Sequence, residues 1–189
     1  MSKHITLLSV VLAAQLLLVA VVNLTGEDYE TFKAEDLLLS IDTQTVDGIR
    51  MEDGTDSVVL HRQEGQWRLP EHGNSPANSH RVELLLNSLA GLKKGWPVAK
   101  TRGAAQRFNV DEKQFKQKLI LLSGGHTEVI LYFGSSPGFR KVYVRQGHEE
   151  EVFAVEFDTS TMAVKTEDWI DKEILILKED DVEPADEGN

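Results

Sequence analysis

The chain has 189 residues, no cysteine and a formal net charge of −11. Without cysteine it has no disulfide, no thiolate ligand for a metal ion and no acylation site of a lipoprotein. The acidic balance disfavours nucleic acid as a partner, because binding to a phosphate backbone depends on Lys and Arg. About 165 residues follow the apolar N-terminus, which is enough for one domain with its own core.

An apolar run begins at Ile5 and ends at Val22, ITLLSVVLAAQLLLVAVV. As a helix rising about 1.5 Å per residue it reaches about 27 Å, close to the ~30 Å hydrocarbon core of a bilayer. Lys3 precedes the run and acidic residues follow it from Glu27, so the positive-inside rule places the N-terminus in the cytoplasm. The pattern predicts an uncleaved transmembrane signal anchor over residues 1–24, with the rest of the chain outside.

Two other interpretations of this run stay open. A cleaved signal peptide has an apolar region of roughly 7–15 residues and a small-x-small cleavage site. This run is longer, and no Ala-x-Ala ends it. A buried core helix is the second alternative. After the anchor we expect a juxtamembrane spacer over residues 25–40, in which 31–40 have the composition of a short helix.

The first half of the expected extracytoplasmic domain, residues 41–176, begins with three β patterns, over 46–51, 57–61 and 67–70. The dipeptides Asp53-Gly54 and Glu64-Gly65 separate these strands and are typical of tight hairpin turns.

A helix follows a polar loop, with Asn78 or Ser79 as its N-terminal cap and Gly91 or Gly95 at its end. Its apolar residues recur every three or four positions, as in a helix with one buried face: Val82, Leu85, Leu86, Leu89 and Leu92.

The second half repeats this order, with a short strand at 97–100, a short helix at 102–108 and a hairpin about Gly124-Gly125. Alternation within the hairpin predicts these inward residues: Leu119, Leu121, Val129, Leu131 and Phe133. Two more strands follow, over 141–145 and 151–155, and then a helix capped by Asp158 or Thr159. The sequence therefore predicts an α+β fold of antiparallel hairpins with packed helices, with two similar β-rich halves as an option.

Charge is unevenly distributed along the chain. Residues 81–118 contain nine Lys and Arg against three Asp and Glu, a net charge of +6. An ordinary solvated face explains this stretch most simply; anionic lipid, an acidic partner and the protein's own tail are alternatives. Residues 177–189 are acidic with few apolar side chains, so we expect a disordered tail.

The segment LYFGSSPGFRKVYVR, residues 131–145, raises the question of a phosphate-binding loop. Such a loop opens directly into a helix, so that backbone N–H groups and the helix dipole converge on the anion. Here the glycine turn leads into an alternating stretch from Lys141 to Arg145, and Pro137-Gly138 is ordinary turn chemistry. The segment therefore predicts a hairpin.

No pattern of residues singles out a catalytic residue, a cofactor site or a metal site. None of the six histidines pairs with another at i, i+4 on an expected helix, and only His72 and His80 flank one loop in a way that suggests even a weak metal site. No Ser-x-x-Lys or Gly-x-Ser-x-Gly motif is present. We expect Trp67, Trp96 and Trp169 to serve a core or an interface.

The order of these motifs carries a resemblance. An apolar anchor is followed by a hairpin ending in WRLP, a Leu-rich helix, RFNV, the hairpin LILLSGGHTEVILYFG, the strands KVYVR and EVFAV, and a closing WIDKEIL. Over 41–175 this resembles an uncharacterised family of domains of unknown function that accompanies gliding-motility-type ABC transporter auxiliary proteins in bacteria. The chain departs from larger members in its single short copy and its lack of a fused permease.

The resemblance implies a periplasmic α+β module beside an ABC transporter permease or auxiliary subunit in the bacterial inner membrane, and no catalytic residues. Five residues match recurring positions of the family and are candidates for an interaction or structural motif: Trp67, Pro70, Gly134, Tyr143 and Arg145. The leading hypothesis is a non-enzymatic, membrane-anchored accessory protein without cofactors. A module that binds envelope glycan or another ligand through Trp67 and Tyr143 is the alternative, and an enzyme is third.

Overall fold

The computed structural model describes residues 7–17 and 36–172, which fall in two separate compact units, Met1–Lys33 and Ala34–Asn189. Residues 7–17 are helical, and leucines around this helix, such as Leu7 and Leu17, are 65–68% exposed. Within the described residues no helix is long and apolar enough to cross a bilayer. The predicted anchor, 1–24, runs beyond the described helix at both ends, and the predicted tail lies outside the described residues.

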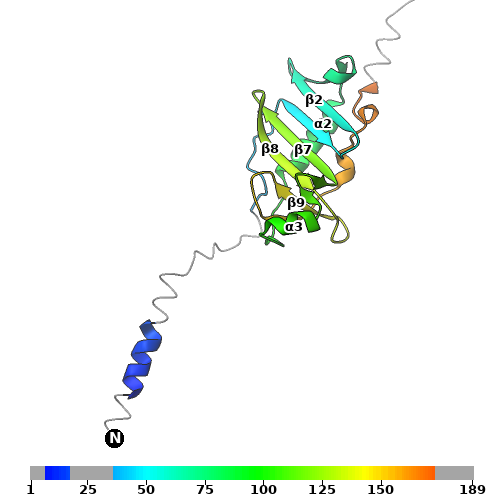
Figure 1. The fold of residues 1–189 in the computed structure, drawn as a ribbon. Helices are drawn as coiled ribbons and strands as arrows, with labels where there is room; N and C mark the ends of the chain where they lie inside the picture. The colour runs from blue at the N-terminus through cyan, green and yellow to red at the C-terminus, as the bar shows by residue number, and fades with distance from the viewer. Residues whose placement is uncertain (1–6, 18–35, 173–189) are drawn as a thin grey trace, which may run out of the picture. The chain divides into compact units, whose positions relative to one another are not determined.

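The second unit is built on one antiparallel sheet in the order β10-β9-β8-β7-β1-β2-β3-β4 (Figure 1). The first four strands form one meander: β1 (Gly48–Glu52), β2 (Ser57–Gln63), β3 (Gln66–Leu69) and β4 (Ser75–Pro76). The other four form a second meander: β7 (Gln117–Ser123), β8 (His126–Phe133), β9 (Lys141–Gln146) and β10 (Val152–Glu156). Pairing of β1 with β7 joins them. The predicted α+β class with antiparallel hairpins is confirmed.

Tight turns form where their residues tolerate left-handed backbone. Glu64 and Gly65 have φ of 50° and 80°, and Gly124 and Gly125 have φ of 58° and 77°, so both turns have the positive φ values that two-residue hairpins require. In the β1–β2 turn, Asp53 Oδ1 accepts hydrogen bonds from the backbone N–H groups of Thr55 and Asp56, each at 2.9 Å. The predicted hairpins are therefore confirmed.

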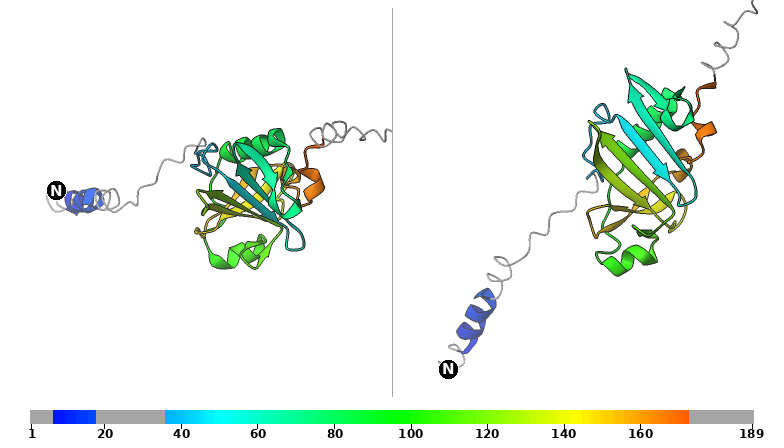
Figure 2. Two further views of the ribbon diagram at one scale, coloured as in Figure 1. Left: turned by 90° about the horizontal axis from the view of Figure 1, so that it is seen from above. Right: turned by 45° about the horizontal axis from the view of Figure 1, so that its top comes forward.

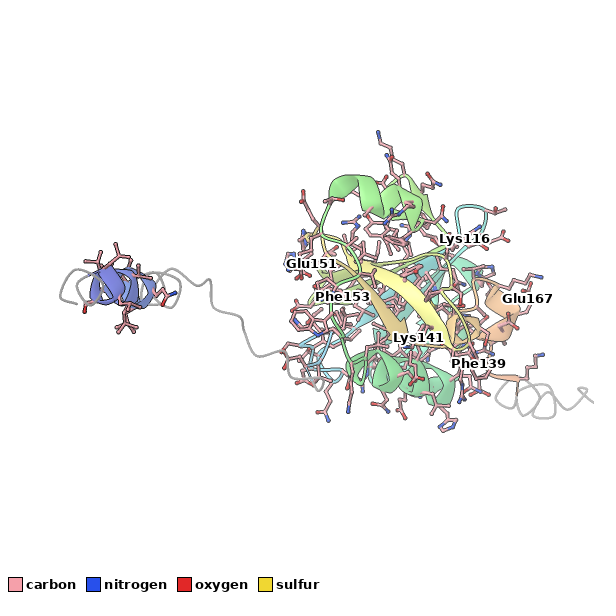
Figure 3. All side chains as sticks on the ribbon, turned by 90° about the horizontal axis from the view of Figure 1, so that it is seen from below. Lys116, Phe139, Lys141, Glu151, Phe153 and Glu167 are labelled. Carbon is pink, nitrogen blue, oxygen red and sulfur yellow. The ribbon has the colours of Figure 1, made fainter. Side chains whose placement is uncertain are left out.

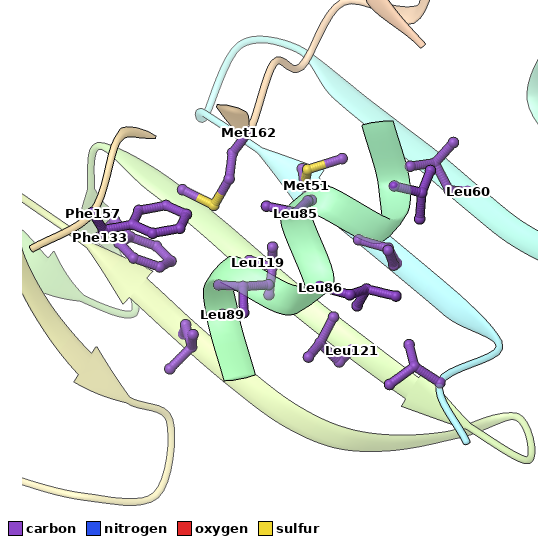
Figure 4. Close-up of a cluster of buried hydrophobic side chains, with 14 of the residues drawn as sticks. Met51, Leu60, Leu85, Leu86, Leu89, Leu119, Leu121, Phe133, Phe157 and Met162 are labelled. Carbon is purple, nitrogen blue, oxygen red and sulfur yellow. The ribbon is translucent and has the colours of Figure 1, made fainter. Parts of the chain in front are cut away.

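Helix α2 (Ser79–Ala90) packs on the inner face of the sheet. The Asn78 side chain caps it by accepting a hydrogen bond from the Arg81 backbone N–H at 2.9 Å, and Gly91 ends it, as predicted. The whole predicted apolar stripe, including Leu92 just beyond the helix, is buried. Figure 4 shows Leu85, Leu86 and Leu89 of the helix over Leu119 and Leu121 of β7.

Alternate side chains of the strands point inward and form the other half of this core. Ile49 pairs with Leu60 and Leu121, and all three are fully buried. Phe133 of β8 stacks on Phe157 with ring centroids 5.1 Å apart. Of the predicted inward residues of the β7–β8 hairpin, four are fully buried and Val129 is partly buried against the same cluster.

A second, smaller cluster lies on the outer face of β8, β9 and β10. It is covered by α3 (Arg102–Arg107) and by the small hairpin of β5 (Val110–Asp111) and β6 (Gln114–Phe115). Its buried members are Ala105, Val110, Tyr132 and Val152. Figure 2 shows α2 and α3 on opposite faces of the sheet. We refer to residues 102–115 as the outer insert.

Two expectations for the segments between strands are wrong. Residues 36–40 are not helical, because Leu37 forms a β-bridge with Lys93 and the Leu38 N–H donates to Leu92 O at 2.7 Å. Leu38 and Leu39 are buried in the main core, so the folded domain includes residues that we assigned to the spacer 25–40. Residues 97–100 form no strand but one bridge, Ala99 to Val152, since Pro97 has no N–H to extend the pairing.

The expected helix after β10 is also wrong, since this segment contains only the short 3₁₀ turns η2 (Thr159–Thr161) and η3 (Thr166–Asp168). The chain leaves β10 at one edge of the sheet, and Ile170 bridges Ala77 beside β4 at the other. Seven strand spacings of about 4.8 Å separate these edges by ~34 Å. Thirteen residues of helix would reach only about 20 Å, so the backbone must be more extended.

We predict that Leu89→Ala destabilises the protein by about 2–5 kcal/mol, because it leaves a cavity under α2. Leu84→Ala on the same helix is the matched control, since Leu84 is 54% exposed, and its free energy of unfolding should change by about 0.5 kcal/mol or less. Urea unfolding measures both. Equal losses in the two variants would show that α2 does not bury the predicted face.

The hydrogen bonds of the β1–β2 turn lead to a prediction about the pKa of Asp53. Hydrogen bonds from the backbone N–H groups of Asp56 and then Thr55 hold the pKa of Asp53 below its ordinary value. A lowered pKa in the folded state means that this stabilisation is complete above the unfolded pKa of about 3.9 and is lost as the pH falls through the folded value. NMR titration should give Asp53 a lower midpoint in the protein than in a peptide of residues 50–59. Equal midpoints would contradict the turn geometry.

Candidate functional site

The five candidate residues fall at two places in the domain. Trp67 lies in β3 and is 3% exposed in the main core, where its carbonyl accepts a hydrogen bond from the Ala77 N–H at 2.8 Å. Pro70 is exposed at the start of the 3₁₀ turn η1 (Pro70–His72), where its fixed φ suits a helical first position. Gly134, Tyr143 and Arg145 lie together on β8–β9. Trp67 and Pro70 thus form no common site with the other three.

Gly134 allows the outer insert to approach the sheet. A Cβ atom there would overlap the Phe108 carbonyl oxygen and would lie 2.8 Å from the Asn109 carbonyl oxygen. The Ser135 N–H donates to the same Phe108 carbonyl at 3.0 Å, and the Asn109 amide donates to Ser135 Oγ at 2.7 Å. Only glycine leaves room for this contact, so the residue at 134 is fixed by packing.

Tyr143 holds the same segment from the next strand. Its ring packs on Phe108 with centroids 4.3 Å apart and planes at 45°. Its N–H donates to Ser135 O at 3.0 Å, and its carbonyl accepts from the Gly134 N–H at 2.9 Å. The ring is therefore partly covered by the outer insert rather than presented to solvent.

Arg145 is, in the part of the chain that the structure describes, the only buried charged side chain, at 7% exposed. Its Nε donates to Val110 O at 2.8 Å. Its Nη1 donates to carbonyl oxygens of the β9–β10 turn, at 3.1 Å to Gln146, 3.4 Å to Gly147 and 3.0 Å to Glu149. The guanidinium also lies 4.8 Å from the centroid of the Tyr132 ring. These carbonyls offset the loss of hydration that burial of the charge causes.

Gly134, Tyr143 and Arg145 therefore form one structural unit, which we call the β8–β9 clasp. Its three members hold three consecutive residues of the outer insert, Phe108, Asn109 and Val110. Asn109 has φ of 57°, a left-handed conformation that Asn tolerates better than most residues. RFNV and KVYVR, far apart in the sequence, are thus parts of the same contact. The clasp is a packing device and presents no reactive group.

The loop beyond the clasp borders a cleft of about 690 Å³. Its lining includes Ser136, Arg140 and Lys141 from the β8–β9 hairpin and Glu156, Phe157 and Asp158 from the end of β10. Ser160 donates from its hydroxyl and its backbone N–H to Asp158, and these bonds hold the pKa of that carboxyl below its ordinary value. Figure 3 shows Phe139 and Lys141 at this end of the sheet, away from Glu151. No local sequence pattern predicts this cleft, although Phe139 directly after a Pro-Gly turn indicates an exposed aromatic side chain.

The strands on either side of residues 134–140 show whether this segment is a phosphate-binding loop or a hairpin. The glycine turn after β8 leads into β9, which pairs antiparallel with β8 through Tyr132–Arg145 and Phe133–Val144. The predicted hairpin is therefore confirmed.

Metal ligands and aromatic ligand platforms were the other possibilities. Among the described residues no three or more His, Cys, Asp or Glu side chains are grouped as they would be around a metal ion. His72 instead lies 3.1 Å from Thr166 Oγ1 through Nε2. The glycan hypothesis required Trp67 and Tyr143 on an open face, but the first is buried and the second packs on Phe108.

Comparison with known proteins gives one match. Residues 67–186 match the family DUF4340, described as a domain of unknown function. No curated protein and no solved structure matches the chain.

We predict that Gly134→Ala destabilises the protein by about 1–3 kcal/mol, because the new methyl group meets backbone carbonyls that cannot rotate away. Gly138→Ala is the matched control in the same loop, since nothing lies within 4 Å of a Cβ built there. Thermal unfolding measures the loss, and hydrogen exchange at residues 108–110 locates it. An unchanged Gly134→Ala variant would contradict the clasp.

Proposed function

The chain belongs to the DUF4340 family, and from this premise we propose that it is a non-enzymatic, membrane-anchored periplasmic accessory protein of an ABC-type transporter complex in the bacterial inner membrane. The observation that carries the proposal is the apolar run from Ile5 to Val22, with Lys3 before it and acidic residues after it. The resemblance in motif order adds the transporter as the partner.

The described part of the run supports an anchor. The helix over 7–17 is apolar except for Ser9 and Gln15, and its large apolar side chains are 49–68% exposed within the structure. A helix that is apolar on all sides requires an apolar environment such as a protein core or a bilayer.

The folded domain supports a binding or structural role. Four of its candidate residues have packing roles: the clasp positions the outer insert, and Trp67 fills the core. The acidic sequence and the absence of a nucleotide-type loop at residues 134–140 are consistent with a protein that acts through contacts. In this proposal the anchor packs against permease helices and the domain meets a periplasmic partner.

We predict that the full-length protein, purified in mild detergent through a C-terminal tag, carries an ABC permease and its ATPase in near-equal amounts. Quantitative mass spectrometry of the purified complex measures this ratio. A matched variant replaces residues 5–22 with an unrelated transmembrane helix of equal length, which keeps the protein in the membrane but removes anchor-specific packing. The variant should lose most of the permease.

Two outcomes would contradict the proposal. One is recovery of the wild-type protein from membranes without any transporter subunit. The other is a domain that, released from its anchor, retains the same partners in the same amounts. The first outcome would exclude a transporter as the partner. The second would show that assembly does not need the anchor.

A further inference from the structure

The β8–β9 loop presents a single aromatic side chain to solvent on a well-defined backbone. Phe139 is 90% exposed, more than any other large apolar side chain in the described residues. Ser136 Oγ lies 2.7 Å from Gly138 O and 2.6 Å from Lys141 O, and the Phe157 N–H donates to Arg140 O at 3.2 Å. The exposed ring is therefore held at the tip of a hydrogen-bonded loop.

Backbone strain marks the same place. Arg140 has φ of 57°, a left-handed conformation that disfavours a long side chain and costs about 1–2 kcal/mol. Its guanidinium lies 5.6 Å from the centroid of the Phe139 ring. Strained residues that persist in a fold are often found where a loop binds something.

The cleft beside Phe139 has charges of opposite sign on its two walls. Val142 and Phe157, both buried or nearly so, supply apolar lining. Arg140 and Lys141 contribute two positive charges, and Glu156 and Asp158 contribute two negative charges, so the charged lining sums to zero. An exposed aromatic side chain thus lies beside a cleft that has two apolar lining residues and charges of both signs.

We propose that this surface binds a second copy of the chain about a twofold axis. Each Phe139 inserts into the cleft of the other copy, and the Arg140–Lys141 pair of each faces the Glu156–Asp158 pair of the other. A twofold interface requires such self-complementarity, because residue i meets residue j and j meets i. The net charge of −11 opposes contact between copies in general, whereas this surface carries no net charge. The proposal does not depend on the transporter or on the anchor.

Sedimentation of the full-length protein in mild detergent tests whether Phe139 contributes to dimerisation. The wild type should form dimers in a concentration-dependent manner, and Phe139→Asp should weaken dimerisation by about 30-fold or more, as expected for a central aromatic contact. Leu84→Asp is the matched control, because Leu84 is 54% exposed on α2 and lies outside the cleft lining. Circular dichroism checks that both variants fold.

Charge-reversed variants test whether opposite charges face each other across the proposed interface. Arg140→Glu with Lys141→Glu gives a wholly acidic surface, and Glu156→Lys gives a basic one while leaving the Asp158 cap in place. Each variant alone should dimerise more weakly than the wild type, but an equimolar mixture should form heterodimers at least about tenfold more tightly than either variant alone. Differently tagged copies report the heterodimer.

Three results would overturn the proposal. One is a wild type that remains monomeric at high concentration. Another is a dimer that Phe139→Asp and Leu84→Asp weaken equally. The last is a mixture of charge-reversed variants that forms no heterodimer, which would leave Phe139 to contact lipid or a different protein.

Discussion

Pairing of β1 with β7 is the interaction on which the domain depends. Five residue pairs, from Gly48–Leu122 to Glu52–Lys118, join the two meanders into one sheet. Gly48 allows this pairing, because a Cβ atom there would lie 2.7 Å from the Leu122 side chain. At the other end Lys118 Nζ lies 2.9 Å from Glu52 Oε1. Only a continuous sheet provides the inner surface that α2 covers, and the distance between its two edge strands explains the extended path of the chain from β10 to β4.

The outer face of the sheet is divided between two environments. Over β8–β10 it is covered by the outer insert, and the clasp of Gly134, Tyr143 and Arg145 fixes that cover by close approach, ring packing and hydrogen bonds to carbonyls. Beyond the clasp the same hairpin extends to the exposed Phe139 and the cleft. The hairpin therefore joins the packed part of the domain to the surface that we propose for contact with a second copy.

The sequence predicted the long strands and α2 well, because their signals are local, but it missed the two-residue strands β4, β5 and β6. Gly124-Gly125 specifies a turn, and the stripe from Val82 to Leu92 specifies one buried helix face, without reference to the rest of the fold. The predictions were wrong where contacts between distant parts of the chain determine the local structure. No local pattern shows that residues after Phe157 must cross the sheet, or that Leu38 pairs beyond α2.

The candidate site was predicted in part for the same reason. Gly134, Tyr143 and Arg145 were selected by their positions in a recurring pattern, but their common contact, residues 108–110, lies more than twenty residues earlier in the chain. The expectation that Trp67 serves a core is confirmed, and only the alternative glycan hypothesis placed it on a ligand face, because period-2 alternation alone does not say which face is buried. The cleft beside Phe139 depends on residues from two strands and went unnoticed.

We propose that a membrane anchor holds this domain outside the cytoplasm, and cysteine labelling can test this topology, since the chain has no native cysteine. His126→Cys places one thiol on the exposed β7–β8 turn, and Ser2→Cys places one before the apolar run. In cells with a permeabilised outer membrane, a membrane-impermeant maleimide should label position 126 but not position 2, on a full-length protein in the membrane fraction. Labelling of position 126 only after lysis, or a soluble protein, would contradict the account.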